Sequence, residues 1–273
     1  MDVLMSVEPL VSPVVDTHCH MDVRYDDEHV LNSVDQAMAN AKSVGIAKVI
    51  QVGCDVASSV WAAEVAGRHS DVWAAVALHP NAAAHDPDLT SSLTEISSLA
   101  NLPQVRAVGE TGLDYFRTGP EGIAAQQESF RAHIEIAKAT NKPVVIHDRD
   151  AHDDVVRILD EQGAPEQVVF HCFSGGLPLA RICADRGWYA SFSGTVTFKN
   201  APELREAAAY LPLDLLLVET DSPFLTPVPY RGRPNSSALL PLTVRAISEV
   251  RGASEQEICE ALFSNSTRVF GPF

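Results

Sequence analysis

The sequence predicts a single (β/α)8 barrel of the TIM type, and three observations lead to this fold. The chain has 273 residues, of which 46% are apolar, and such barrels typically need about 250 residues. Short runs rich in apolar and β-branched residues recur at intervals of roughly 30 residues, which is typical of strands. Helical patterns separate these runs, and regular alternation of strand and helix favours a parallel sheet.

The predicted strands are eight apolar runs. The run Leu215-Leu216-Leu217-Val218 shows their character, because a strand covered on both faces needs near-continuous apolar residues. The eight runs are Val14–His20, Lys48–Cys54, Val72–His79, Val105–Gly109, Pro143–His147, Val168–His171, Trp188–Ser193 and Leu215–Glu219.

Apolar residues at helical spacing lie between the predicted strands. One apolar stripe predicts a helix from Val30 to Val44, which Gly45 can end. Another predicts a helix from Ile123 to Ala137 that stops before Asn141. We therefore expect helices to cover the outside of the strands.

Alternating strands and helices can also form an open, doubly wound sheet. However, no Gly-x-Gly-x-x-Gly motif follows the first predicted strand to mark a dinucleotide site. We therefore predict a closed barrel, with a short N-terminal extension over residues 1–13 and one domain over residues 14–273. The proline-rich segment from Pro223 to Pro241 is expected to form a long loop over the barrel mouth.

Composition restricts the classes of function and the expected location. The 36 acidic and 20 basic residues give a formal charge of −16, which argues against binding nucleic acid through a broad basic surface. A polyanionic substrate would need bound cations to reverse the local field. Five cysteines without a Cys-x-x-Cys pair indicate neither a disulfide framework nor a zinc ribbon. Because a signal peptide and long apolar segments are also lacking, we expect a soluble cytoplasmic protein.

Histidines and carboxylates stand where the predicted strands end. Alternation along the first strand places His18 and His20 on one face, within reach of one metal ion. The carboxyl ends of barrel strands meet at the rim where catalytic groups converge. Taken singly, each candidate could be a core histidine, a helix cap or an ion-pair partner. Together, four histidines and two carboxylates predict a site for two metal ions, formed by His18, His20, Glu110, His147, His171 and Asp221.

Five ordered motifs resemble those of the TatD family, whose members are metal-dependent DNases with amidohydrolase-like barrels. The resemblance extends from about Val14 to Phe270. The motifs are Asp16-Thr-His-Cys-His-Met-Asp22, Gly109-Glu-Thr-Gly-Leu-Asp114, Pro143-Val-Val-Ile-His-Asp-Arg149, His171-Cys-Phe-Ser-Gly175 and Glu219-Thr-Asp-Ser-Pro-Phe-Leu-Thr-Pro227.

The resemblance implies phosphodiester hydrolysis, commonly by a 3′-to-5′ exonuclease that acts on single-stranded or damaged DNA. Two metal ions about 3.5 to 4 Å apart can supply a nucleophile and neutralise developing charge. Glu110 and Asp221 are the expected catalytic carboxylates, and Asp221 would also orient the attacking water and accept its proton. The implied ligand sets are His18, His20 and Asp221 for one ion and His147 and His171 for the other, with Glu110 bridging both.

Four further residues are predicted to bind substrate. Arg149 follows His147 by two residues, while Arg231 and Arg233 lie on the proline-rich segment, and guanidinium groups can grip phosphate with two hydrogen bonds. Surface charges are the alternative for these arginines. His79 ends the third strand and is expected to contact substrate or carry a proton, unless it is a structural histidine.

Two motifs depart from the family pattern. The segment from Arg231 to Ser237 reads Arg-Gly-Arg-Pro-Asn-Ser-Ser where Asn-Glu-Pro is expected, and Ala77-Leu-His-Pro80 begins with Ala in place of Gly. Both departures concern substrate handling, because neither includes a proposed ligand. The sequence does not determine the identity of the metal ions. Imidazole and carboxylate ligands suit zinc, manganese and iron, and magnesium fits if water molecules fill much of its coordination shell.

Two rival functions remain at this stage. The same metal chemistry would serve an amide or ester hydrolase, such as one that removes D-amino acids from tRNA. A non-catalytic scaffold would have no physical need of six ligands at one rim. From the resemblance we expect a DNA substrate as the partner. We expect neither binding to a membrane nor an obligatory protein partner.

Overall fold

The computed structural model describes residues 7–272, so the predicted extension over residues 1–13 and the end of the predicted domain lie partly outside it. Eight parallel strands follow one another in chain order around a sheet, which confirms the predicted barrel. The strands are β1 (Val14–Cys19), β2 (Ile46–Val52), β3 (Val72–Val76), β4 (Val105–Asp114), β5 (Val144–Arg149), β6 (Val168–Phe170), β7 (Tyr189–Phe192) and β8 (Leu216–Val218).

The barrel closes where the first strand meets the segment after the last. The backbone N–H of Asp221 donates to the carbonyl of His18 at 2.9 Å, and Cys19 forms a parallel bridge with Ser222. The hydroxyl of Thr17 adds a bond of 2.8 Å to the carbonyl of Val218. These contacts bring β1 and the chain after β8 together, so residues some 200 positions apart become neighbours.

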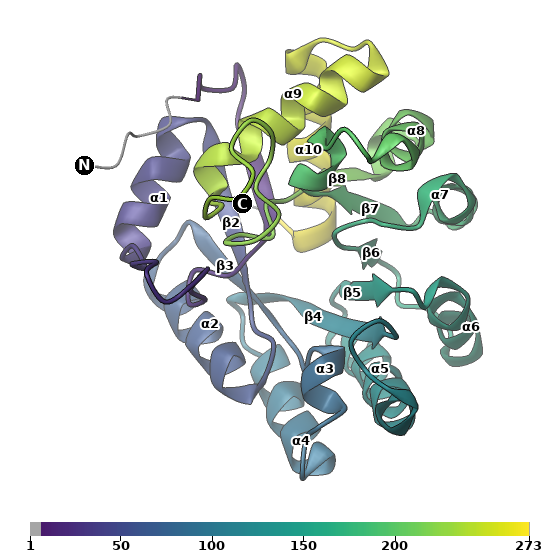
Figure 1. Cartoon of the computed structure of the whole chain (residues 1–273). Coiled ribbons are helices and arrows are strands. Elements are labelled where there is room, and N and C mark those ends of the chain that lie inside the picture. The colour runs from purple at the N-terminus through teal and green to yellow at the C-terminus, as the bar shows by residue number, and fades with distance from the viewer. Residues whose placement is uncertain (1–6, 273) are drawn as a thin grey trace.

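Helices surround the strands on the outside of the barrel (Figure 1). Among residues 7–272, none of them has the length and apolar content that a membrane crossing requires. They are α1 (Val34–Ser43), α2 (Val56–Arg68), α3 (Pro80–Ala83), α4 (Leu89–Ala100), α5 (Pro120–Thr140), α6 (His152–Gln162), α7 (Gly176–Arg186), α8 (Pro202–Tyr210), α9 (Leu240–Arg251) and α10 (Glu255–Phe270), with short 3-10 turns η1 (Gly194–Thr197), η2 (Leu213–Leu215) and η3 (Ser237–Leu239).

The first predicted helix and the predicted proline-rich loop differ in extent from the observed elements. Val30 is 82% exposed and lies outside α1, because Ser33 caps that helix by accepting a bond from the N–H of Gln36. The proline-rich segment is irregular only as far as η3, since α9 begins at Leu240. Pro241 fits the first turn of α9, where a helix leaves its N–H groups unpaired.

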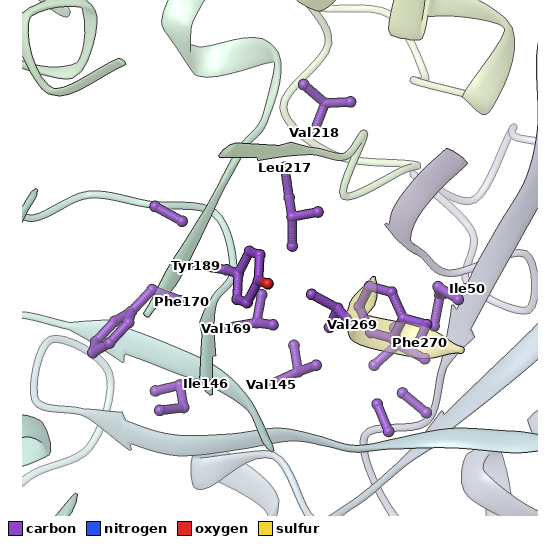
Figure 2. Close-up of a cluster of buried hydrophobic side chains, with 14 of the residues drawn as sticks. Ile50, Val145, Ile146, Val169, Phe170, Tyr189, Leu217, Val218, Val269 and Phe270 are labelled. Carbon is purple, nitrogen blue, oxygen red and sulfur yellow. The ribbon is translucent and has the colours of Figure 1, made fainter. Parts of the chain in front are cut away.

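The last two residues of α10 pack against one end of the barrel. Val269 and Phe270 of α10 are buried and lie among side chains of several strands, including Val145 and Tyr189 (Figure 2). Val145 and Tyr189 stand at the starts of β5 and β7, so this apolar cluster packs the amino end of the barrel. The carboxyl end is left for polar residues.

Strand β4 runs five residues beyond its predicted end at Gly109, and this extension shapes the mouth of the barrel. Its register against β5 shifts between Val108 and Thr111. Gly112 has φ +134°, and a Cβ there would lie 2.1 Å from the carbonyl oxygen of His147. Only glycine allows so close an approach in this conformation, so β4 can carry Glu110 to the mouth while it stays paired with β5.

A buried histidine on α5 gives a testable pH dependence of stability. His133 is fully buried, with Nε2 accepting from the N–H of Leu78 at 3.1 Å and Nδ1 donating to the carbonyl of Ser129 at 2.7 Å. Both bonds suit the neutral ring, and burial lowers its pKa from 6.5 to about 4. The unfolded chain therefore binds the proton more readily. The contribution of neutral His133 to the free energy of unfolding is fully present above pH 6.5 and is lost as the pH falls towards 4.

We expect His133→Gln to weaken this acid dependence. Urea denaturation at pH 7.5 and pH 4.5 should show that the free energy of unfolding falls less in the variant, by about 2 to 3 kcal/mol. Groups common to both proteins cancel in this comparison. Parallel losses in the two proteins would show that His133 does not contribute.

Candidate metal centre

The six predicted ligands come together at the carboxyl end of the barrel. His18 and His147 lie in the last residues of β1 and β5, and Glu110 lies in the extended part of β4. His20, His171 and Asp221 follow the ends of β1, β6 and β8 within three residues. Strands far apart in the sequence thus deliver their polar side chains to one place, as the barrel geometry requires.

The first half of the cluster involves one oxygen of Glu110. The Nε2 atoms of His18 and His20 lie 3.1 Å apart, and each is 3.5 Å from Oε1 of Glu110. Oδ1 of Asp221 lies 3.7 Å from Nε2 of His18 and 3.5 Å from Nε2 of His20. Two imidazoles and two carboxylates therefore surround one point.

The second half involves the other oxygen of Glu110. Nδ1 of His147 lies 3.2 Å and Nε2 of His171 lies 2.9 Å from Oε2 of Glu110. The two histidine nitrogens are 3.5 Å apart. The carboxylate of Glu110 thus stands between two pairs of imidazoles, with one oxygen directed at each pair.

Hydrogen bonds on the outer side of three histidines decide which ring nitrogen faces Glu110. His20 donates from Nδ1 to the carbonyl of Val52 at 3.1 Å, and His171 donates from Nδ1 to Glu219 at 3.2 Å. His147 donates from Nε2 to Asp114, also at 3.2 Å. Such outer acceptors fix the tautomer of a metal-binding histidine.

The clustered histidines and carboxylates are suited to bind divalent metal ions. In the neutral tautomers, ring lone pairs face carboxylate oxygens at 2.9 to 3.5 Å, and such facing lone pairs need a proton or a cation between them. Three groups of residues in the described chain each bring three possible metal-ligand atoms within 4.8 Å of one another. They are His18 with His171 and Asp221, His18 with His20 and Glu110, and His79 with Glu110 and His147. Imidazole with carboxylate suits zinc, manganese or iron.

The charges of the cluster are mutually dependent. Burial by itself would raise the pKa of Glu110, but the neighbouring histidines, above all His171, hold it well below its usual range. Burial opposes protonation of His171, yet Glu110 and Glu219 raise its pKa well above the usual value. The protein thus keeps a carboxylate ionised in a buried place by surrounding it with groups that accept positive charge.

His79 points into the second half of the cluster. Its Nε2 lies 3.3 Å from Nδ1 of His147 and 3.7 Å from Oε2 of Glu110, while its Nδ1 accepts from the N–H of Asn81 at 3.1 Å. Burial lowers the pKa of His79 to about 4, so the ring is neutral and its proton lies on Nε2. His79 therefore offers an N–H donor to the barrel mouth.

The three predicted arginines lie around the mouth, and two of them stack on aromatic rings. The guanidinium of Arg149 lies 4.0 Å from the ring centre of Phe116, and that of Arg231 lies 4.0 Å from the ring centre of Phe198. Arg233 is exposed on the loop between β8 and α9. The guanidinium groups of Arg149 and Arg231 thus contact aromatic rings, and Arg233 faces solvent.

Sequence reasoning missed three residues of this centre. Asp114 and Glu219 orient His147 and His171, and their positions at the ends of β4 and β8 were the available signal. Cys54 is the third of these residues. Its Sγ lies 3.5 Å from Oε1 of Glu110, because β2 ends at Val52 and the chain after it turns over the mouth.

The fold and the clustered ligands define the class of barrel-shaped metal-dependent hydrolases. A family model for TatD related DNases matches residues 15–271, and the chain belongs to this family. It is 42% identical to the uncharacterized metal-dependent hydrolase TatD of Mycobacterium tuberculosis, over 94% of this chain and 98% of that one. The uncharacterized metal-dependent hydrolase YcfH of Escherichia coli K12 is 38% identical, over 94% and 95% of the respective chains.

Solved structures agree with this assignment. The TatD homologue YjjV of Escherichia coli K12 superposes with a TM-score of 0.85 at 29% identity, covering 94% of this chain and 97% of that one. A TatD family hydrolase from Entamoeba histolytica gives 0.80 at 19% identity, with 98% and 100% covered, and supports the fold alone.

Replacing Asp114 tests its influence on His147. An amide in Asp114→Asn can donate to Nε2 of His147, which would move the ring proton to Nδ1 and remove the lone pair that faces Glu110. We expect one of two metal ions to bind about 10 to 100 times more weakly, measured by competition with a chelator. Asp185→Asn, an exposed carboxylate on α7, is the control. Unchanged affinity for both ions would rule out this role of Asp114.

Proposed function

We propose that the protein is a metal-dependent phosphodiesterase that hydrolyses DNA. The observation that carries the proposal is the placement of Glu110, whose two oxygens face different pairs of imidazoles at 2.9 to 3.5 Å. The proposed ligands of one divalent ion are His18, His20 and Asp221, those of the other are His147 and His171, and Glu110 is shared. When bound, two such ions activate water and stabilise the charge on a phosphate that undergoes in-line attack.

Asp221 is the proposed proton acceptor. Its side chain is 16% exposed, whereas those of His18 and Glu110 are buried, so Asp221 can meet a water molecule that enters from the mouth. One of its carboxylate oxygens orients the attacking water and takes its proton. A group within hydrogen-bond reach of that proton is the geometric requirement for a general base.

The substrate phosphate is proposed to contact His79 and the mouth arginines. The Nε2–H of His79 is directed at the cluster, where it can donate to a phosphate oxygen. Arg149 stands at the end of β5, two residues beyond His147, and its guanidinium can bind phosphate with two bonds. Arg231 and Arg233 on the loop after β8 are proposed to hold more distant phosphates of the strand.

The support for DNA over an amide substrate is the description of the matching family as related to DNases, together with these phosphate-binding side chains. We infer removal of nucleotides from the 3′ end of single-stranded or damaged DNA. The five cysteines carry free thiols, which supports action in the reducing cytoplasm.

The first test is hydrolysis of end-labelled single-stranded DNA by metal-stripped protein, after addition of Mg²⁺, Mn²⁺ or Zn²⁺. We expect metal to restore cleavage. A 5′ label should yield a ladder of shortening products, and a 3′ label should appear at once as mononucleotide. The reverse pattern would overturn the 3′-to-5′ direction.

Two isosteric variants then test the residues. Asp221→Asn keeps the side-chain volume and suits the left-handed backbone at this position, where φ is 53°. We expect it and Glu110→Gln to lower kcat by about 100-fold or more, with Asp185→Asn again unchanged. Protein shown to bind two ions that hydrolyses amides or esters but no DNA would replace this proposal with the acyl-hydrolase function.

A further inference from the structure

An exposed aromatic ring stands beside the proposed metal centre. Phe116 lies on the loop between β4 and α5 and is 64% exposed. The guanidinium of Arg149 lies over its ring, 4.0 Å from the ring centre. A planar cation stacked on an exposed ring forms a surface on which another flat group can stack.

The position of Phe116 is fixed through the metal centre itself. Oδ1 of Asp114 accepts from the backbone N–H groups of Phe116 at 3.1 Å and Arg117 at 2.8 Å. Oδ2 of the same carboxylate accepts from Nε2 of His147. A single buried side chain thus ties a proposed metal ligand and the backbone of the exposed ring together.

The backbone of Arg149 is held by the same loop. The N–H of Tyr115 donates to the carbonyl of Arg149 at 2.9 Å, which continues the pairing of β4 with β5 as far as the loop. Isolated exposed apolar side chains are common on protein surfaces and need no function. Phe116 differs in two respects: hydrogen bonds hold its backbone in place, and its ring contacts the guanidinium of Arg149, which is proposed to bind phosphate.

We propose that Phe116 and Arg149 form a subsite that stacks one unpaired nucleobase of the DNA beside the phosphate to be cleaved. This inference rests on the proposed function. Aromatic side chains stack on any base and so bind single strands with little sequence preference. A base inside a duplex is already paired and stacked, and it must be extruded before it can reach such a ring. Phe116 would therefore select frayed or single-stranded ends.

The test compares a normal single-stranded oligonucleotide with one whose last 3′ nucleotides lack their bases, using the metal-loaded enzyme. We expect Phe116→Leu to lower kcat/KM on the normal DNA about tenfold, within the range that one stacked base contributes. The same change should leave the base-free DNA nearly unaffected. Phe116→Trp should retain the preference for normal DNA.

Tyr210→Leu is the matched control. Tyr210 is also an exposed aromatic residue near an arginine, since the guanidinium of Arg181 lies 5.8 Å from its ring centre. It lies at the end of α8, outside the barrel. We expect this variant to match the wild type on both substrates.

The outcomes separate the two proposals. If the wild type cleaves neither DNA, the proposed function fails and the subsite fails with it. If the wild type cleaves DNA and Phe116→Leu has no effect, or lowers activity equally on both substrates, only the subsite is overturned. A change of oligomeric state in Phe116→Leu, measured by light scattering, would also overturn it, because the ring would then be a subunit contact.

Discussion

The carboxylate of Glu110 is buried at the mouth of the barrel, and the arrangement of the residues around it depends on compensating its charge. A charge that is only 3% exposed costs several kcal/mol unless opposite charge surrounds it. Strands β1, β5 and β6 meet this requirement by ending in or beside histidines that face its two oxygens. Those rings are in turn oriented by Asp114, Glu219 and the carbonyl of Val52. The ends of several strands are therefore fixed around one side chain.

Much of this arrangement follows from the sequence, because alternation along a strand and closure of a barrel are regular geometries. They bring His18 and His20 to one face and carry His147 to the same rim without further information. Other features depend on particular contacts. Gly112 allows β4 to continue past Gly109 only because its positive φ and missing Cβ suit the carbonyl of His147, and a strand pattern does not reveal this.

The hydrogen bonds on the outer side of the histidines and the paths of the loops could not be predicted from the sequence, because they too depend on particular contacts. The role of Asp114 depends on which nitrogen of His147 it meets, which the order of residues does not determine. Cys54 lies at the proposed metal centre because the chain turns after β2, and this turn is not evident from the sequence around it. The acidic composition also does not describe the mouth, where Arg149 ends β5 and Arg231 and Arg233 lie on the loop after β8, although the chain carries a formal charge of −16.

The packing of Val269 and Phe270 at the amino end of the barrel (Figure 2) separates what stabilises the molecule from what determines its chemistry. Apolar contacts at that end are far from the loops that follow β4, β7 and β8, so those loops can diverge without loosening the core. This separation accounts for a shared fold between chains that have only 19% of their residues in common. Evolution can accordingly exchange substrates at one end of the barrel while the other end preserves the scaffold.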